Sequence, residues 1–236
     1  MSQEDAKRAA AMAAARRLPE AGIIGLGSGS TSRLFIEEVG RLVAQGKKYQ
    51  GVPTSAESRK LAESLGIPLL SDDGPWEIDV CVDGADEVDG ELNLIKGGGA
   101  ALLREKIVNQ ASRMNVIIID ESKISTKLGE QWPVPVEVAR FGHASTALQL
   151  ARLGKAVLRT KSGTPVITDA GGYIYDLVVG PIDRPDRLDA ALRGVPGVVE
   201  TGLFLTRVSL LLVASASGGV REISPAHGSP SQWAIE

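Results

Sequence analysis

The chain is poor in the residue types that mark several classes of proteins. Only 4% of its 236 residues are aromatic, so its core must be built mainly from Ala, Val, Leu and Ile. Its single cysteine, Cys81, excludes an intrachain disulfide and lies in an apolar stretch, where we expect a small buried side chain. The two histidines, His143 and His227, are far apart in sequence, which argues against a histidine-rich metal site.

The chain also has no excess of basic charge and no long apolar segment. Its formal net charge is −3 and it has no basic stripe with interleaved aromatics, so nucleic acid is not an expected partner. No apolar run approaches the roughly 20 residues that span a bilayer. The alanine-rich residues 9–15 after Lys7 and Arg8 imitate a signal peptide, but acids precede the basic pair and arginines follow the alanines. We therefore expect a cytoplasmic protein without a membrane or nucleic-acid partner.

Apolar segments alternate with helical patterns through the first half of the chain. Strands are predicted at residues 23–27, 49–52, 67–70, 78–82, 92–95 and 116–119. Helices are predicted at the N-terminus, after residue 31, at 56–65 and between residues 99 and 112. This alternation, with nearly continuous apolar strands, predicts an α/β fold with a Rossmann-like parallel sheet covered on both faces.

The pattern changes at residues 132–135. Strands are predicted at 134–138, 156–158, around 166, at 173–179 and at 198–201, with helices at 144–153 and 187–193. That order, β-α-β-β-α-β, predicts a smaller ferredoxin-like α+β domain over residues 131–204. A strand at 209–214 is expected to return to the first sheet, so the Rossmann-like domain would comprise residues 1–130 and 205–224. Residues 225–236 are expected to be a flexible tail.

Four carboxylates directly follow the predicted strand 78–82; they belong to Asp83, Asp86, Glu87 and Asp89. Hydrogen bonds within a loop explain one or two acids easily, but they explain a crowd of four less well. In parallel sheets, ligands bind at the carboxyl ends of strands. A divalent cation is an alternative occupant, although the repeating acid pattern of a calcium loop is absent. These acids therefore predict a ligand site.

A turn rich in glycine and hydroxyl groups precedes the second helix; it contains Gly27, Ser28, Gly29, Ser30 and Thr31. The spacing fits neither the dinucleotide-binding glycine pattern nor a P-loop. At a helix N-terminus, such a turn can offer N–H groups to an anion. An ordinary tight turn with a serine cap remains an equally good interpretation.

Glu105 is a candidate general base. Its helical neighbours Ala101, Leu102 and Val108 are apolar, so it shares an inward face, where a partly desolvated carboxylate suits proton transfer. The alternative is a solvated glutamate paired with Arg104 or Lys106. Lys96, followed by three glycines, offers a cation and bare backbone N–H groups just before this helix.

Together these segments resemble the ribose-5-phosphate isomerases of the A type. The matching segments are residues 27–31, 83–87, 96–106, 120–123, 133–138 and 196–204, and the similarity extends from the first helix to about residue 223. Ser28 departs from the family pattern, because many members have threonine there, but it keeps the hydroxyl.

The resemblance implies interconversion of D-ribose 5-phosphate and D-ribulose 5-phosphate in the pentose phosphate pathway, without a metal or organic cofactor, by a homodimer or homotetramer. It implies that Glu105 moves a proton between C2 and C1 through a cis-enediolate, that Asp83 assists ring opening, and that Lys96 lies near the developing oxyanion. The implied substrate-binding residues are Lys7, Ser28, Gly29, Ser30, Thr31, Asp83, Gly84, Ala85, Asp86, Lys96, Gly97, Gly98, Gly99 and Lys123. Lys7 and Lys123 are placed near the phosphate, although surface lysines are the alternative interpretation of both.

Three other functions compete with this one. An amino-sugar-phosphate deaminase/isomerase would release ammonia from glucosamine 6-phosphate, but no catalytic histidine motif supports it. A non-catalytic sugar-phosphate sensor would need an output module, and no helix-turn-helix segment precedes residue 23. A dinucleotide-dependent dehydrogenase lacks its glycine pattern.

Overall fold

The computed structural model describes residues 3–215 and 218–225, and within them the chain divides into two compact units. The first unit comprises residues 3–84, 108–121, 206–215 and 218–225, and the second comprises residues 85–107 and 122–205. This division differs from the predicted one, because residues 85–107, 122–130 and 205 pack with the second unit. Apart from residue 225, the predicted tail lies outside the described residues.

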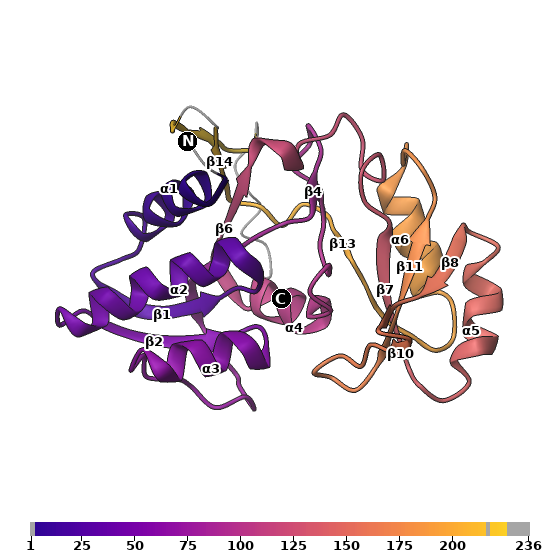
Figure 1. Cartoon of the computed structure of the whole chain (residues 1–236), viewed down its shortest axis with the longest axis horizontal. Coiled ribbons are helices and arrows are strands. Elements are labelled where there is room, and N and C mark those ends of the chain that lie inside the picture. Colours follow the sequence, from indigo (N-terminus) through magenta and orange to yellow (C-terminus); the bar gives the residue numbers. More distant parts are fainter. Residues whose placement is uncertain (1–2, 216–217, 226–236) are drawn as a thin grey trace, which may run out of the picture. The chain divides into compact units, whose positions relative to one another are not determined.

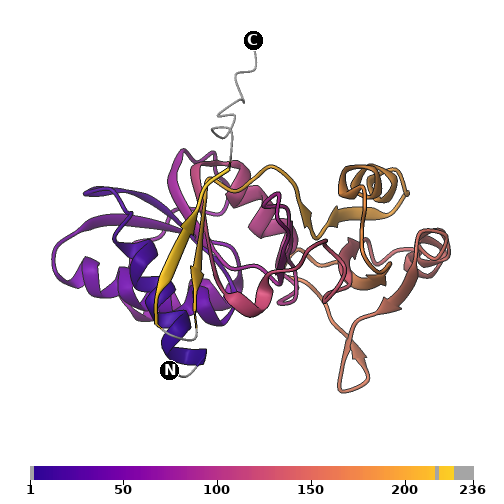
Figure 2. The same ribbon diagram turned by 90° about the horizontal axis from the view of Figure 1, so that it is seen from above.

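The first unit is built on a six-stranded sheet with the order β15-β14-β6-β3-β1-β2 (Figure 1). All of its neighbouring strands are parallel except β15, which runs antiparallel to β14 at the edge (Figure 2). The unit contains α1 (Gln3–Ala15), β1 (Ala21–Leu26), α2 (Gly29–Ala44), β2 (Lys48–Pro53), α3 (Ala56–Ser64), β3 (Ile78–Asp83), β6 (Ser112–Asp120), β14 (Leu210–Ala214) and β15 (Val220–Ile223). The predicted Rossmann-like α/β fold is confirmed.

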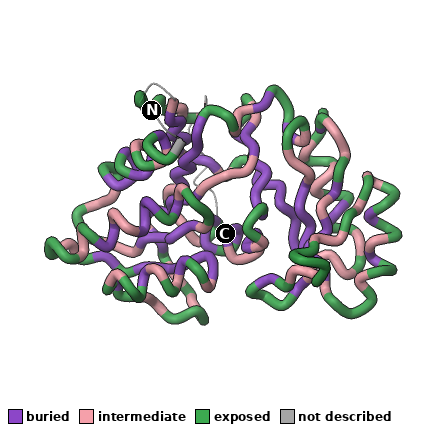
Figure 3. Tube along the Cα trace, in the orientation of Figure 1, coloured by how far each residue is buried: buried purple, intermediate pink, exposed green. Residues whose placement is uncertain are grey.

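Both faces of this sheet are buried, as the nearly continuous apolar strands predict. The trace along much of this sheet is coloured as buried (Figure 3). On one face, Ile24 and Leu26 of β1 belong to an apolar cluster with residues of α1 and α2. On the other face, Cys81 and Val108 belong to a smaller cluster, and a Cβ added to Gly25 would lie 2.9 Å from atoms of both. Cys81 is buried, as its apolar surroundings in the sequence predict.

The second unit contains a four-stranded antiparallel sheet with the order β12-β7-β11-β8. Helices α5 and α6 supply Leu150 and Leu192 to the apolar cluster on one face of this sheet. The chain order β7-α5-β8-β11-α6-β12 confirms the predicted ferredoxin-like arrangement. These elements are β7 (Val134–Val138), α5 (His143–Leu150), β8 (Lys155–Leu158), β11 (Tyr173–Val178), α6 (Pro185–Arg193) and β12 (Val198–Thr201).

Shorter elements complete the second unit. Strands β13 (Leu203–Phe204), β5 (Leu94–Ile95) and β4 (Glu87–Val88) form a three-stranded antiparallel sheet. A hairpin joins β9 (Thr160–Lys161) to β10 (Thr164–Pro165), and a short 3-10 helix, η1 (Glu121–Lys123), begins at the last residue of the first unit and continues into the second. Helix α4 (Leu102–Gln110) begins in the second unit and ends in the first.

Three strand predictions are wrong in detail. Residues 67–70 form only a single bridge to Gly51, because Pro68 has no N–H to donate to a ladder. The segment 92–95 shortens to β5, which belongs to the antiparallel β4–β5–β13 sheet and not to the parallel one. Val166 is not in a strand; it follows the β9–β10 hairpin, and its N–H donates to Arg159 O at 3.0 Å.

Strand β15 was not predicted. Its residues are exposed or partly exposed, so the sequence carries no apolar alternation to indicate a strand. No helix within residues 3–215 and 218–225 has both the length and the hydropathy needed to cross a membrane.

Candidate active site

Asp83, the last residue of β3, is a buried carboxylate in the first unit, 3% exposed. Its Oδ1 accepts hydrogen bonds from Ser28 N at 2.9 Å, Gly84 N at 2.8 Å and Ser32 Oγ at 3.2 Å. A Cβ at Gly27 would lie 2.3 Å from the same oxygen, so only glycine fits there. The carboxylate is therefore held in one position against the start of α2.

The glycine-rich turn is fixed from several sides within the first unit. Ser58 Oγ donates to Gly27 O at 2.6 Å, and the hydroxyls of Ser28 and Thr54 are 2.7 Å apart. Although Ser28 is the N-cap of α2, its side chain makes no capping hydrogen bond. This arrangement leaves the N–H groups of the first helical turn available to an anion.

Lys7 of α1 lies at the same helix N-terminus. Its Nζ donates to Ser30 Oγ at 3.0 Å. Ser30 is exposed, as is Gly29, whose φ of +88° lies in the region that favours glycine. The first unit thus brings together Lys7, residues 28–31, Asp83 and Gly84 out of the predicted site residues.

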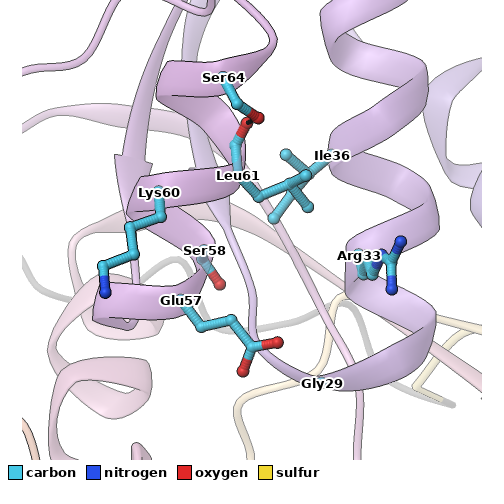
Figure 4. Close-up of a pocket in the computed structure, with 8 residues that line it drawn as sticks. All are labelled: Gly29, Arg33, Ile36, Glu57, Ser58, Lys60, Leu61 and Ser64. Atoms are coloured by element: carbon cyan, nitrogen blue, oxygen red, sulfur yellow. Dashed lines mark hydrogen bonds between the residues drawn. The ribbon is translucent and has the colours of Figure 1, made fainter.

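A surface groove of about 330 Å³ lies between α2 and α3, beside Gly29 (Figure 4). Its hydroxyl groups are engaged by the protein: Ser58 donates to Gly27 O, and Ser64 donates to Leu61 O at 2.7 Å. Arg33 at its rim forms an ion pair with Glu37 at 3.2 Å. Of the predicted site residues, only Gly29 lines this groove. We assign the residues of the groove a role in supporting the glycine-rich turn.

The second unit contains a buried ion pair between two of the predicted catalytic residues. Lys96 Nζ lies 3.3 Å from Glu105 Oε1, and the side chains are 3% and 6% exposed. Lys96 Nζ also lies 5.5 Å from the centroid of the Phe204 ring. Glu105 is therefore not the solvated surface glutamate of the alternative interpretation, and it forms a buried ion pair with Lys96.

The three glycines after Lys96 are held by another predicted site residue. Gly98 N donates to Asp86 Oδ2 at 2.7 Å, and a Cβ at Gly98 would lie 2.6 Å from Asp86 Oδ1. Lys96 N donates to Gly202 O at 2.9 Å. Residues 85–86, 96–99 and Glu105 thus belong to one part of the second unit.

The acids Glu87 and Asp89 bind backbone groups of the second unit. Glu87 is fully buried and accepts hydrogen bonds from three N–H groups, and Asp89 Oδ1 accepts from Glu91 N and Asn93 N, both at 2.9 Å. No group of three or more His, Cys, Asp or Glu side chains in the described residues could hold a metal ion. The alternative of a cation held by all four acids is therefore not supported by their geometry.

Lys123 lies elsewhere in the second unit, at the end of η1. Its Nζ is 5.1 Å from the centroid of the Trp132 ring, a cation–π contact. The backbone N–H of Trp132 donates to Glu87 Oε2 at 3.3 Å, so the buried carboxylate holds the backbone of the residue whose ring Lys123 contacts.

Lys106 is a buried residue whose role sequence reasoning missed. Its Nζ donates to Glu200 Oε1 at 2.9 Å, Thr201 O at 2.6 Å and Leu203 O at 2.8 Å, and it lies 4.6 Å from the Phe204 ring centroid. Burial lowers the pKa of Lys106 to about 8, against the opposing effect of Glu200. The sequence signal was a charged residue inside the matching segment 96–106, but its partners lie nearly a hundred residues away.

Arg159 was also missed. Its guanidinium donates to Gly97 O at 2.6 Å and Gly98 O at 3.1 Å, and it pairs with Asp176. Since it lies outside every motif, no local pattern indicates it.

Comparisons with known proteins agree on one family. The model of the family described as ribose 5-phosphate isomerase A (phosphoriboisomerase A) matches residues 50–218, more than half of the chain. The ribose-5-phosphate isomerase A of Methylorubrum extorquens is 47% identical over 232 residues, covering 95% of this chain and 98% of that protein. That of Parvibaculum lavamentivorans is 45% identical over 226 residues, covering 92% and 97%.

Solved structures give the same result. A D-ribose-5-phosphate isomerase in complex with phospho-erythronic acid has a TM-score of 0.90 at 38% identity, covering 95% of this chain and all of that chain. The ribose 5-phosphate isomerase A of Methanocaldococcus jannaschii has a TM-score of 0.88 at 39% identity, covering 94% and 100%. The chain, an α/β protein with a buried Lys96–Glu105 pair, belongs to the ribose 5-phosphate isomerase A family.

Proposed function

We propose that this isomerase interconverts D-ribose 5-phosphate and D-ribulose 5-phosphate in the pentose phosphate pathway, with Glu105 as the proton-transfer base. The observation that carries the proposal is the buried ion pair between Glu105 and Lys96. A carboxylate held away from water and beside a cation is equipped to take a proton from carbon and to return it to the neighbouring carbon. We infer the substrate from the family to which the chain belongs.

The proposed reaction begins with the opening of the furanose ring. Asp83 takes the proton of the anomeric hydroxyl and returns it to O4 as the C1–O4 bond breaks. Glu105 then removes the proton from C2, which generates a cis-enediolate across C1 and C2. Lys96 stabilises the negative charge that develops on oxygen, and the N–H groups of residues 97–99 are further donors for it. Asp83 moves the proton of O2 to O1, and return of the proton from Glu105 to C1 yields the ketose, with no net redox change.

The phosphate requires cations and N–H groups. Lys7 and the first turn of α2 supply both in the first unit, and Lys123 is a further cation in the second. We assign phosphate recognition to these groups and assign no metal or organic cofactor. Assembly as a homodimer or homotetramer and a cytoplasmic location stay predictions from the sequence.

The test is turnover of ribose 5-phosphate by purified protein treated with chelator, with Glu105→Gln alongside. Loss of a general base should lower kcat by about 10²–10⁴-fold, while folding and weak substrate binding persist. Near-normal turnover by Glu105→Gln would refute the base assignment. If the unmodified protein binds ribose 5-phosphate but does not convert it, the sensor function replaces this one, and release of ammonia from glucosamine 6-phosphate identifies the deaminase alternative.

A further inference from the structure

Arg159 forms hydrogen bonds with the glycine-rich loop of residues 97–99, although it lies 62 residues after Gly97 in the chain. One nitrogen, Nη1, donates to Gly97 O at 2.6 Å and to Gly98 O at 3.1 Å. Arginine suits this task because its planar fork can serve several acceptors at once. Two successive carbonyls of residues 97–99 are therefore attached to one guanidinium.

Asp176 in the central part of the antiparallel sheet orients that guanidinium. Arg159 Nε donates to Asp176 Oδ2 at 2.9 Å, and Nη2 pairs with Oδ1, so the contact is bidentate. The backbone of Arg159 is held too, because its N–H donates to Ile174 O at 2.8 Å and its carbonyl accepts from Val166 N at 3.0 Å. The side chains of Arg159 and Asp176 are 17% and 22% exposed. The guanidinium thus has little freedom to move.

The consequence for the loop follows from the planarity of the peptide bond. In a trans peptide, the C=O and the next N–H point in opposite directions. Gly97 O faces Arg159 and Gly98 N faces Asp86, so that peptide is held from both sides. By the same rule, the contact between Gly98 O and Arg159 directs the N–H of Gly99 away from the guanidinium. Gly99 is exposed, and its N–H makes no hydrogen bond within the described residues.

We propose that Arg159, oriented by Asp176, is a positioning residue that aims the Gly99 N–H at the oxygen where negative charge develops in the enediolate. The inference rests on the proposed isomerase function and deepens it. A donor helps catalysis only if it is already directed at that oxygen, and glycines alone cannot hold one orientation. Arg159 supplies the missing constraint without touching the substrate.

The experiment compares Arg159→Met, Asp176→Asn and their double variant with Arg184→Met. Arg184 forms an exposed pair with Asp186 in the same unit and serves as the matched control. Misdirecting one oxyanion donor should lower kcat of Arg159→Met by about 10- to 100-fold, with KM changed by less than about threefold. Asp176→Asn should lower kcat by less, and the double variant should be no worse than Arg159→Met, because Asp176 acts through Arg159. Arg184→Met should match the parent protein.

Two inhibitors separate positioning from simple loss of structure. The carboxylate of 4-phospho-D-erythronate stands in for the enediolate oxygens, whereas ribitol 5-phosphate carries no negative charge at that place. We expect Arg159→Met to bind phospho-erythronate more weakly by the factor lost in kcat and to bind ribitol 5-phosphate as the parent does. Equal weakening of both inhibitors would overturn the proposal, since it would indicate a collapsed site.

Turnover by the parent protein distinguishes a failure of the proposed isomerase function from a failure of the positioning role. If it does not isomerise ribose 5-phosphate, the proposed function fails. If it does and Arg159→Met keeps a kcat within about twofold, only the positioning role fails. If Arg159→Met does not fold, Asp176→Asn decides alone: an unchanged kcat overturns the inference, and a lowered kcat with selectively weakened phospho-erythronate binding supports it.

Discussion

Glu87 offers a direct test of why a buried carboxylate lies in β4, shortly after β3. It is fully buried and accepts Gly129 N at 2.9 Å and Trp132 N at 3.3 Å on Oε2, and Gln131 N at 3.0 Å on Oε1. Glu87→Gln keeps the size of the side chain and replaces one acceptor by a donor. The variant therefore isolates the role of the carboxylate from that of packing.

The magnitude can be worked out from these three bonds. A glutamine can keep its oxygen on the side of Gly129 and Trp132, but its NH2 group then faces the Gln131 N–H, and an unsatisfied buried donor costs about 1–3 kcal/mol. The two retained bonds change from charged to neutral acceptors, which weakens each by about 1 kcal/mol. Burying a neutral amide costs less than burying a carboxylate and offsets part of this loss. We expect a net loss of about 3 kcal/mol in the free energy of unfolding.

The assay is urea-induced unfolding at pH 7, with Glu91→Gln as the control, since Glu91 is exposed in the same loop. The control should stay within about 0.5 kcal/mol of the parent protein. KM should rise in Glu87→Gln, because the hydrogen bond that holds the backbone of Trp132 becomes weaker, and the Trp132 ring contacts Lys123. A loss of stability below about 1 kcal/mol would refute the reasoning that the three N–H groups need a charged acceptor.

Two further predictions concern steric fit and pH. Gly27→Ala places a Cβ 2.3 Å from Asp83 Oδ1, so it should displace the carboxylate and lower kcat at least about tenfold. Gly90→Ala, where the Cβ meets no atom within 4 Å, should change neither kcat nor stability, and a fully active Gly27→Ala would disprove the argument. The pKa of Lys106 falls from 10.5 to about 8 on folding, so the unfolded chain binds more protons between these values and stability due to Lys106 rises with pH there. At 1.36 kcal/mol per pKa unit, the rise in the free energy of unfolding is about 3 kcal/mol. This rise should be seen in the parent protein, but not in Lys106→Met, when unfolding is followed from pH 8 to 10.5.

The sequence predicts the elements whose signal is local. The strands β3 and β6 are continuous apolar runs that contain Val82 and Val116, and both were found because burial on two faces requires such runs. Residues 67–70 imitate that signal, but Pro68 removes the N–H that a strand needs. Strand β15 was missed for the opposite reason, since an exposed edge strand needs no apolar residues.

The residues of the candidate site also fall into those that the sequence predicts and those that it does not. Asp83 was found because four carboxylates crowd the segment that begins at the end of a predicted buried strand. Of its three donors, Ser28 N and Gly84 N lie in segments that the sequence had already indicated, and Ser32 Oγ lies in α2. Arg159 could not be found, because arginine between two short strands is common and its meaning depends on which carbonyls it reaches. Apart from the presence of glycine, the residue types of a segment do not predict how its peptide bonds are oriented.

The Lys96–Glu105 pair shows most clearly where local patterns end. Helical spacing places Glu105 on an apolar face, but it does not predict which cation forms an ion pair with it. Lys96 is fixed through its N–H to Gly202 O, and a Cβ at Gly202 would lie 2.4 Å from Lys96 O. Lys106, next to Glu105, donates to Thr201 O, 95 residues later in the chain. Both sides of the ion pair are thus attached to neighbouring residues of one distant segment, so its geometry is a property of the folded second unit and of no single motif.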